Sequence, residues 1–207
     1  WATPLFFKSF EHGVDVSVHA ATKYLSGHGD IMMGAIVSNE RCWQVVHRTR
    51  NQFGQCVGPD DAYVTLRSLR TLPVRMQAHQ EQGIALAQWL ATRTEVARVL
   101  HPALPAFPGH ALWQRDFLGA AGLFGVVLQP CPRQALVALV DGLELFGIGA
   151  SWGGYQSLLI PVYPEKNRSV TTWDEAGPVL RIHAGLESLP DLVADLEAGF
   201  ARLGTAV

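Results

Sequence analysis

The order of apolar and polar residues along the chain predicts alternating strands and helices. Period-two alternation at residues 14–19 indicates a strand with one buried face. The nearly continuous apolar run at residues 31–37 indicates a strand covered on both faces. Further strands are predicted where short apolar runs lie between turn residues, at 96–100, 123–128, 145–149 and 179–183.

Helices are predicted from capping residues and helical periodicity. Asn39 is a suitable N-cap for a helix that continues to about residue 56. Residues 60–92 favour helix, and Pro73 should kink or divide that segment. Two more helices are expected, at residues 132–142 and after Ser188, where apolar residues form one stripe. The pattern predicts an α/β fold.

Length and composition restrict the class of protein. A chain of 207 residues is long enough for one large domain or two small ones. We place the boundary at the helical connector, which gives the segments 1–72 and 73–207. Apolar residues make up 48% and charged residues 16%, which excludes a disordered tail. A net charge of −2 provides no basic field for nucleic acid or an anionic membrane, so we expect neither as a partner.

Targeting and metal signals are not visible. No apolar run approaches the ~20 residues of a membrane-spanning helix, and no signal peptide is apparent. The three scattered cysteines form neither a disulfide framework nor a CxxC metal site, and the eight histidines have no metal-ligand spacing. We therefore expect a cytoplasmic protein without a bound metal. The cysteines are Cys42, Cys56 and Cys131.

Lysine is scarce, and one lysine has an unusual setting. Only Lys8, Lys23 and Lys166 are present. Lys23 follows an apolar strand and precedes a glycine-rich turn, where partial desolvation would lower its pKa and free the amine for Schiff-base chemistry. The hydroxyl of neighbouring Thr22 could hold a phosphate oxygen. The alternative is a solvated lysine at the end of a strand.

A second motif surrounds Ser151. Residues 149–153 fit the pattern G-x-S-x-G after a predicted strand, and Asp174 and His183 follow in the order of a serine-hydrolase triad. However, Pro161 interrupts the region where that fold needs a helix, and no oxyanion segment is visible. A tight loop permitted by glycine is the alternative interpretation.

Arg181 lies within an otherwise apolar strand. A guanidinium in such a strand needs an anionic partner. The partner could be an internal carboxylate, as in a structural ion pair, or a substrate carboxylate that arginine binds through two hydrogen bonds. Both interpretations remain open at this point.

Several segments together resemble the pyridoxal-phosphate-dependent enzymes of cysteine and methionine metabolism. The resemblance covers essentially the whole chain, and the segment around Lys23 is specific for the family. The segments are Trp-Ala-Thr-Pro-Leu-Phe from Trp1, residues 19–30 around Lys23, residues 62–72, residues 101–105, Ser-Trp-Gly-Gly-Tyr from Ser151 and Arg-Ile-His-Ala-Gly-Leu-Glu from Arg181.

The resemblance implies a fold and a set of site residues. The fold would be part of an aspartate aminotransferase-like (fold type I) large domain, followed by a C-terminal α/β domain. Lys23 would hold pyridoxal 5'-phosphate as a Schiff base and later move the Cα proton, and Thr22 would bind the cofactor phosphate. Arg181 would bind the substrate α-carboxylate with help from Ser151 and the backbone of Trp152.

The resemblance also implies a reaction. The loop at Trp152 favours members that cleave at the β carbon over those that act at the γ carbon. The expected reaction is α,β-elimination of the amino-acid thioether L-cystathionine to homocysteine, pyruvate and ammonia in methionine biosynthesis, by a homotetramer. The alternatives are a related family member (a γ-synthase, γ-lyase or cysteine desulfhydrase), a serine hydrolase that uses Ser151, and a non-catalytic folding or oligomerisation module.

The chain departs from the family pattern at three places. Ala20 occupies a position where serine often binds the phosphate, and Ala150 occupies a position where β-lyases commonly have tyrosine. The family's aspartate at the pyridine nitrogen, its stacking tyrosine and its backbone phosphate cradle would precede Trp1. We therefore expect this chain to be the C-terminal part of a longer enzyme and to be inactive alone.

Overall fold

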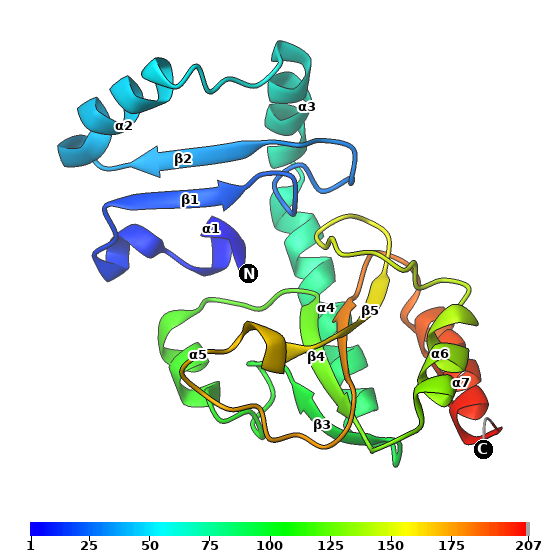
Figure 1. Ribbon diagram of the computed structural model, residues 1–207. Coiled ribbons are helices and arrows are strands. Elements are labelled where there is room, and N and C mark those ends of the chain that lie inside the picture. Colours follow the sequence, from blue (N-terminus) through cyan, green and yellow to red (C-terminus); the bar gives the residue numbers. More distant parts are fainter. Residues whose placement is uncertain (206–207) are drawn as a thin grey trace.

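The computed structural model describes residues 1–205, which form a mixed α/β fold with a β-hairpin and a larger sheet (Figure 1). The hairpin pairs β1 (Val16–Ala20) with β2 (Gly34–Ser38) in antiparallel register, with Val16 opposite Ser38. Short helical turns precede it and two helices follow it. These elements are α1 (Thr3–Phe6), η1 (Ser9–His12), α2 (Glu40–Gln52) and α3 (Pro59–Leu69).

The helix α4 (Leu72–Leu90) connects the hairpin region to the larger sheet, as Figure 1 shows. Pro73 lies in its first turn, where the missing N–H of proline removes no helical hydrogen bond. The prediction that Pro73 divides the helical segment is confirmed, because α3 ends at Leu69. Gly83 lets α4 pack closely: a Cβ there would lie 2.8 Å from the carbonyl oxygen of Ala121.

The larger sheet is antiparallel, with the strand order β3-β4-β6-β5. Its strands are β3 (Val96–Leu100), β4 (Leu123–Leu128), β5 (Leu158–Val162) and β6 (Val179–His183). Helices α6 (Arg133–Asp141) and α7 (Leu189–Thr205) pack against it together with α4, while α5 (His110–Asp116) and η2 (Pro164–Asn167) lie in its connections. The core is formed by buried aliphatic and aromatic side chains from these elements, including Leu86, Leu90, Val126, Leu139, Leu180, Ile182, Leu192 and Phe200.

Two predicted strands differ from the structure. Residues 145–149 do not form a strand: a single bridge joins Gly147 to Leu158, and β5 occupies the edge of the sheet. β5 was not predicted; it contains Pro161, which an edge strand tolerates. The backbone of residues 144–146 is instead held by Asp195, whose carboxylate accepts three backbone N–H bonds.

The second strand of the hairpin is shorter and more exposed than its apolar sequence suggests. β2 begins only at Gly34, and Ile36 and Val37 are 52% and 48% exposed. The expectation of a strand covered on both faces is therefore wrong for the described residues, in which β2 pairs only with β1. The helix predicted after Asn39 is confirmed, because the Asn39 side chain accepts a hydrogen bond from the N–H of Cys42.

The helices within residues 1–205 lack the length and apolar character that a membrane-spanning segment requires. The division of the chain at residues 72 and 73 stays a prediction.

Candidate active site

Lys23 lies in the turn that follows β1, and local hydrogen bonds fix that turn. The N–H of Lys23 donates to the carbonyl of Ala20 at 3.0 Å, and the N–H of Gly27 donates to the carbonyl of Lys23 at 2.8 Å. The Ser26 hydroxyl donates to the carbonyl of Thr22 at 3.1 Å. Because these bonds constrain the backbone on both sides, the Lys23 side chain leaves the turn from a defined position.

Arg75 on α4 forms hydrogen bonds to the backbone of the same turn. Its guanidinium is buried and donates to the carbonyl of Tyr24 at 2.8 Å, to that of Ser68 at 3.0 Å and to the Thr71 hydroxyl at 3.1 Å. Gly27 has a φ of +73°, and a Cβ at this position would overlap the Arg75 guanidinium. Arg75 therefore joins the Lys23 turn to the helix that carries the larger sheet.

The Lys23 amine contacts residues that are far away in sequence. Nζ donates to the Ser151 hydroxyl at 2.8 Å and lies 4.4 Å from the centre of the Trp152 ring. Burial lowers the pKa of the Lys23 amine, and the nearby positive charge of Arg181 lowers it further. This environment makes the free amine more accessible near neutral pH than it is in a solvated lysine.

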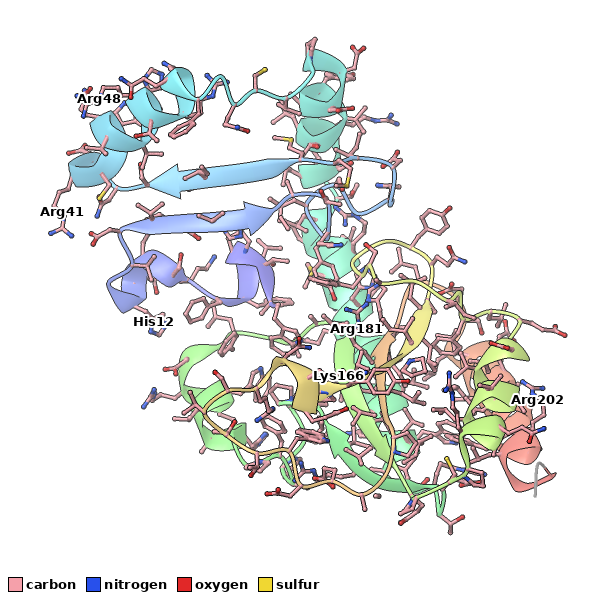
Figure 2. The ribbon with its side chains drawn as sticks, in the orientation of Figure 1. His12, Arg41, Arg48, Lys166, Arg181 and Arg202 are labelled. Atoms are coloured by element: carbon pink, nitrogen blue, oxygen red, sulfur yellow. The ribbon has the colours of Figure 1, made fainter. Side chains whose placement is uncertain are left out.

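Arg181 on β6 lies beside the same loop, in the region between the hairpin and the larger sheet (Figure 2). Its guanidinium donates to the carbonyls of Gly149 and Ser151 at 3.4 and 3.3 Å and lies 5.5 Å from the Trp152 ring centre. Among the described residues, no carboxylate forms an ion pair with it. Two long bonds to carbonyls leave this guanidinium able to bind an incoming carboxylate.

The loop that bears Ser151 and Trp152 needs glycine at position 153. Gly153 has a φ of +83°, and a Cβ there would lie 2.6 Å from the backbone nitrogen of Tyr24 and 2.8 Å from the carbonyl carbon of Lys23. The loop backbone therefore lies directly against the Lys23 turn. This close approach is what brings Ser151 and Trp152 to the amine.

Gly153→Ala is expected to lower the free energy of unfolding by at least about 2 kcal/mol, because it combines a left-handed backbone with a steric overlap. Gly154→Ala is the matched control: its Cβ would meet nothing closer than 3.7 Å. For that variant a change below about 1 kcal/mol is expected. Urea denaturation of the two variants measures the difference, and equal losses would contradict the close-packing argument.

The Thr22 hydroxyl, which was predicted to bind the cofactor phosphate, is already hydrogen-bonded to the backbone of Met33. It accepts a hydrogen bond from the N–H of Met33 at 2.9 Å and donates to the carbonyl of Met33 at 3.3 Å. To donate to a phosphate, the hydroxyl would have to turn away from that second, longer bond. The role of Thr22 in phosphate binding stays a prediction.

The structure does not assemble the serine-hydrolase triad. Ser151 is bonded to Lys23, and the ring of His183 is bonded to the loop backbone at Gly153 and Gly154. Asp174 is exposed and accepts a hydrogen bond from Thr172. Neither His183 nor Asp174 activates the serine in this arrangement, which argues against that alternative.

Arg75 was not singled out from the sequence, and Gly153 and His183 were noted there only within the G-x-S-x-G motif and the serine-hydrolase triad. The glycine pair after Trp152 was a usable signal, since adjacent glycines often mark a close backbone approach. A buried arginine in a helix and a buried histidine in a strand have no comparable local signal, because their partners lie in distant segments.

The donor set fits pyridoxal phosphate at one contact and an amino-acid substrate at another. A primary amine with a lowered pKa suits the aldehyde carbon of such a cofactor. An arginine without a carboxylate partner suits the carboxylate of an amino acid held beside it. Both groups lie close to the Trp152 ring, within one cluster that also contains Ser151.

Comparison with known proteins agrees with this chemistry. Residues 1–201 match the Cys/Met metabolism PLP-dependent enzyme family. Cystathionine beta-lyase of Salmonella typhimurium is 47% identical over 98% of this chain, and L-alanine/L-glutamate racemase of Wolbachia pipientis is 42% identical over 98% of it. These matches cover 52% and 51% of the two relatives' lengths, so the chain spans about half of the curated relatives it matches.

A solved structure confirms the fold class. The cystathionine gamma synthase of Xanthomonas oryzae pv. oryzae in complex with cystathionine superposes with a TM-score of 0.88 at 34% identity, covering 99% of this chain and 54% of that one. The mixed α/β fold predicted from the family resemblance is therefore correct. The chain belongs to the Cys/Met metabolism PLP-dependent enzyme family.

Proposed function

We propose that this chain provides the lysine and the carboxylate-binding arginine of a carbon–sulfur lyase that performs α,β-elimination on L-cystathionine. The observation that supports this most directly is the meeting of Lys23, Ser151 and Trp152, with Arg181 beside them. The 47% identity to a cystathionine beta-lyase gives separate support.

In this proposal each side chain has a distinct task. Pyridoxal phosphate, when bound, supplies the electron sink that stabilises negative charge at Cα. The Lys23 amine removes the Cα proton of the substrate and returns a proton to the departing sulfur. Ser151 orients the amine through the 2.8 Å hydrogen bond. Arg181 binds the α-carboxylate, and Trp152 lies against the amine and shields it in part from solvent.

Relatives named for other activities define the main alternatives. The amine and the arginine would serve a γ-synthase or a racemase equally well, because all three reactions begin at the Cα of an amino acid. Product analysis separates them. A β-lyase releases pyruvate and a thiol from L-cystathionine, whereas a racemase converts L-alanine to its mirror image.

Schiff-base formation between Lys23 and pyridoxal phosphate can be tested on this chain itself. Incubation with pyridoxal phosphate, followed by borohydride reduction and digestion, is expected to label Lys23 in preference to Lys8 and Lys166. Labelling should rise with pH, because only the unprotonated amine reacts, and its midpoint should lie below that of a solvated lysine, because burial lowers the Lys23 pKa. Peptide mass spectrometry measures the label at each lysine. Equal labelling of all three lysines at every pH would contradict the assignment.

Assembly into a homotetramer and cytoplasmic placement are further parts of the proposal. Exposed apolar side chains near the hairpin support assembly. They line a groove of about 830 Å³ between β2, α2 and the start of α3, and include Val18, Met32, Ile36 and Trp43. Apolar surface of this kind typically packs against another protein segment.

A further inference from the structure

His183 is a buried residue of β6 to which the proposed reaction assigns no role. It follows Arg181 by two positions, so both side chains leave the same face of the strand. Its side chain is enclosed, with 1% of the residue exposed. Along this face of the strand, the Arg181 side chain is partly exposed at the site and the His183 imidazole is buried.

The imidazole contacts the loop that carries Ser151 and Trp152. Nε2 of His183 lies 3.0 Å from the backbone nitrogen of Gly153 and 3.0 Å from the carbonyl oxygen of Gly154. A neutral ring accepts from the first or donates to the second, depending on its tautomer. In either tautomer, one ring nitrogen fastens the loop backbone immediately after Trp152.

The position of this bond decides where the loop lies. Gly153 rests against the backbone of Lys23 and Tyr24, where a Cβ would lie less than 3 Å away. Two residues earlier, the Ser151 hydroxyl accepts a hydrogen bond from the Lys23 amine, and the Ser151 carbonyl accepts one from Arg181. Displacing the Gly153 backbone would therefore separate both contacts at once.

The ring of His183 is itself held by aromatic neighbours from two other elements. Tyr24, which follows Lys23, contacts it edge-on with ring centres 5.9 Å apart, and His79 of α4 lies 5.2 Å away. Nδ1 of His79 donates to the carbonyl of Ala184 at 3.0 Å, which secures the end of β6. The charged Arg181 on β6 acts on the His183 ring, whereas the cationic Arg75 on α4 and the anionic Glu187 act on His79.

We propose that His183 is a positioning residue for the Lys23 site: its Nε2 anchors the loop at Gly153 and Gly154 and so holds Ser151 and Trp152 against the Lys23 amine. The inference rests on the proposed function only in assuming that the Lys23 amine takes part in the reaction. Burial lowers the pKa of His183 to about 4, so the ring is neutral at any pH where the Lys23 amine titrates.

The test compares three substitutions that differ in where they place a hydrogen-bonding atom. His183→Gln puts a polar atom close to the position of Nε2, His183→Asn puts one near Nδ1 and too far from the loop, and His183→Leu removes it. Rates of reductive methylation of Lys23 against pH, read by mass spectrometry, give a midpoint that reports the amine's pKa and a plateau that reports its accessibility. Hydrogen exchange of residues 151–157 reports the loop.

The expected result is a pair of matched changes. In His183→Leu and His183→Asn, exchange in residues 151–157 should rise at least tenfold and the Lys23 midpoint should shift upward, because the amine loses its cover and becomes better solvated. His183→Gln should restore both values toward those of the original chain. A loss of stability alone does not predict rescue by glutamine but not by asparagine.

Two outcomes would overturn the proposal. One is an unchanged Lys23 midpoint in a leucine variant whose loop exchanges faster. The other is identical behaviour of the glutamine and asparagine variants, a comparison that stands even if the leucine variant fails to fold. Exchange within α7 serves as the check on folding. Because both measurements use the chain without cofactor or substrate, their result is independent of whether the lyase proposal holds.

Discussion

Replacement of Lys23 by alanine is expected to reduce pyruvate release from L-cystathionine by at least about 10³-fold, because the change removes both the covalent attachment point and the proton-transfer group. The measurement uses a polypeptide of the relatives' length, in which this chain replaces the matching half of the Salmonella relative. Coupling the pyruvate to lactate dehydrogenase gives the rate, and the unsubstituted chimera provides the reference.

Two control variants separate the amine's chemistry from its charge. Lys166 lies in an exposed turn and contacts the ring of Tyr163, so Lys166→Ala should retain full activity. Figure 2 shows Lys166 in the η2 segment, away from the hairpin. Lys23→Arg keeps a cation near Trp152, yet it should be as inactive as the alanine variant because a guanidinium stays protonated. Substantial turnover by either Lys23 variant would contradict the assigned role.

Substitution of Arg181 by leucine is expected to lower kcat/KM for L-cystathionine by about 10- to 100-fold, which corresponds to the loss of a hydrogen bond to a charged group worth about 1.5–3 kcal/mol. Most of the loss should arise as an increased KM, since the arginine is proposed to bind the carboxylate equally in the ground and transition states. Initial rates over a range of substrate concentrations measure both parameters.

Arg181→Lys tests the geometry of that contact. Lysine keeps the charge but cannot donate two parallel hydrogen bonds, so it should recover only part of the lost kcat/KM. Arg48 on α2 offers a matched control for loss of an arginine: it is exposed and distant from Arg181 (Figure 2). A normal KM in Arg181→Leu would show that the carboxylate is bound elsewhere.

Local sequence patterns predicted most of the helices and strands, because each depends on neighbouring residues. The signals were the Asn39 cap, the proline in the first turn of α4 and the apolar runs of β4 and β6. Each of them depends on interactions between residues that are only a few positions apart in the chain. The errors arose where distant segments compete. Residues 145–149 were expected to form a strand, but β5 is the segment that pairs with β6, over five positions, and residues 145–149 make only a single bridge to it.

The candidate site divides in the same way. Lys23 and Arg181 were found from the sequence because a scarce lysine before a glycine-rich turn and an arginine inside an apolar strand are locally unusual. The family resemblance then supplied their expected roles. Their relation to each other was not available from spacing, because 158 positions, from 23 to 181, separate them in the chain.

The sequence by itself determined which residues carry reactive groups, and it determined the type of fold. Only the tertiary structure decided that the Ser151 hydroxyl meets the Lys23 amine across 128 positions of sequence, and that Arg181 has no carboxylate partner among the described residues. It also decided that His183 fastens the loop that makes this contact. The physical reason is that hydrogen bonds and desolvation depend on distance in space, and packing around α4 and β6 sets those distances.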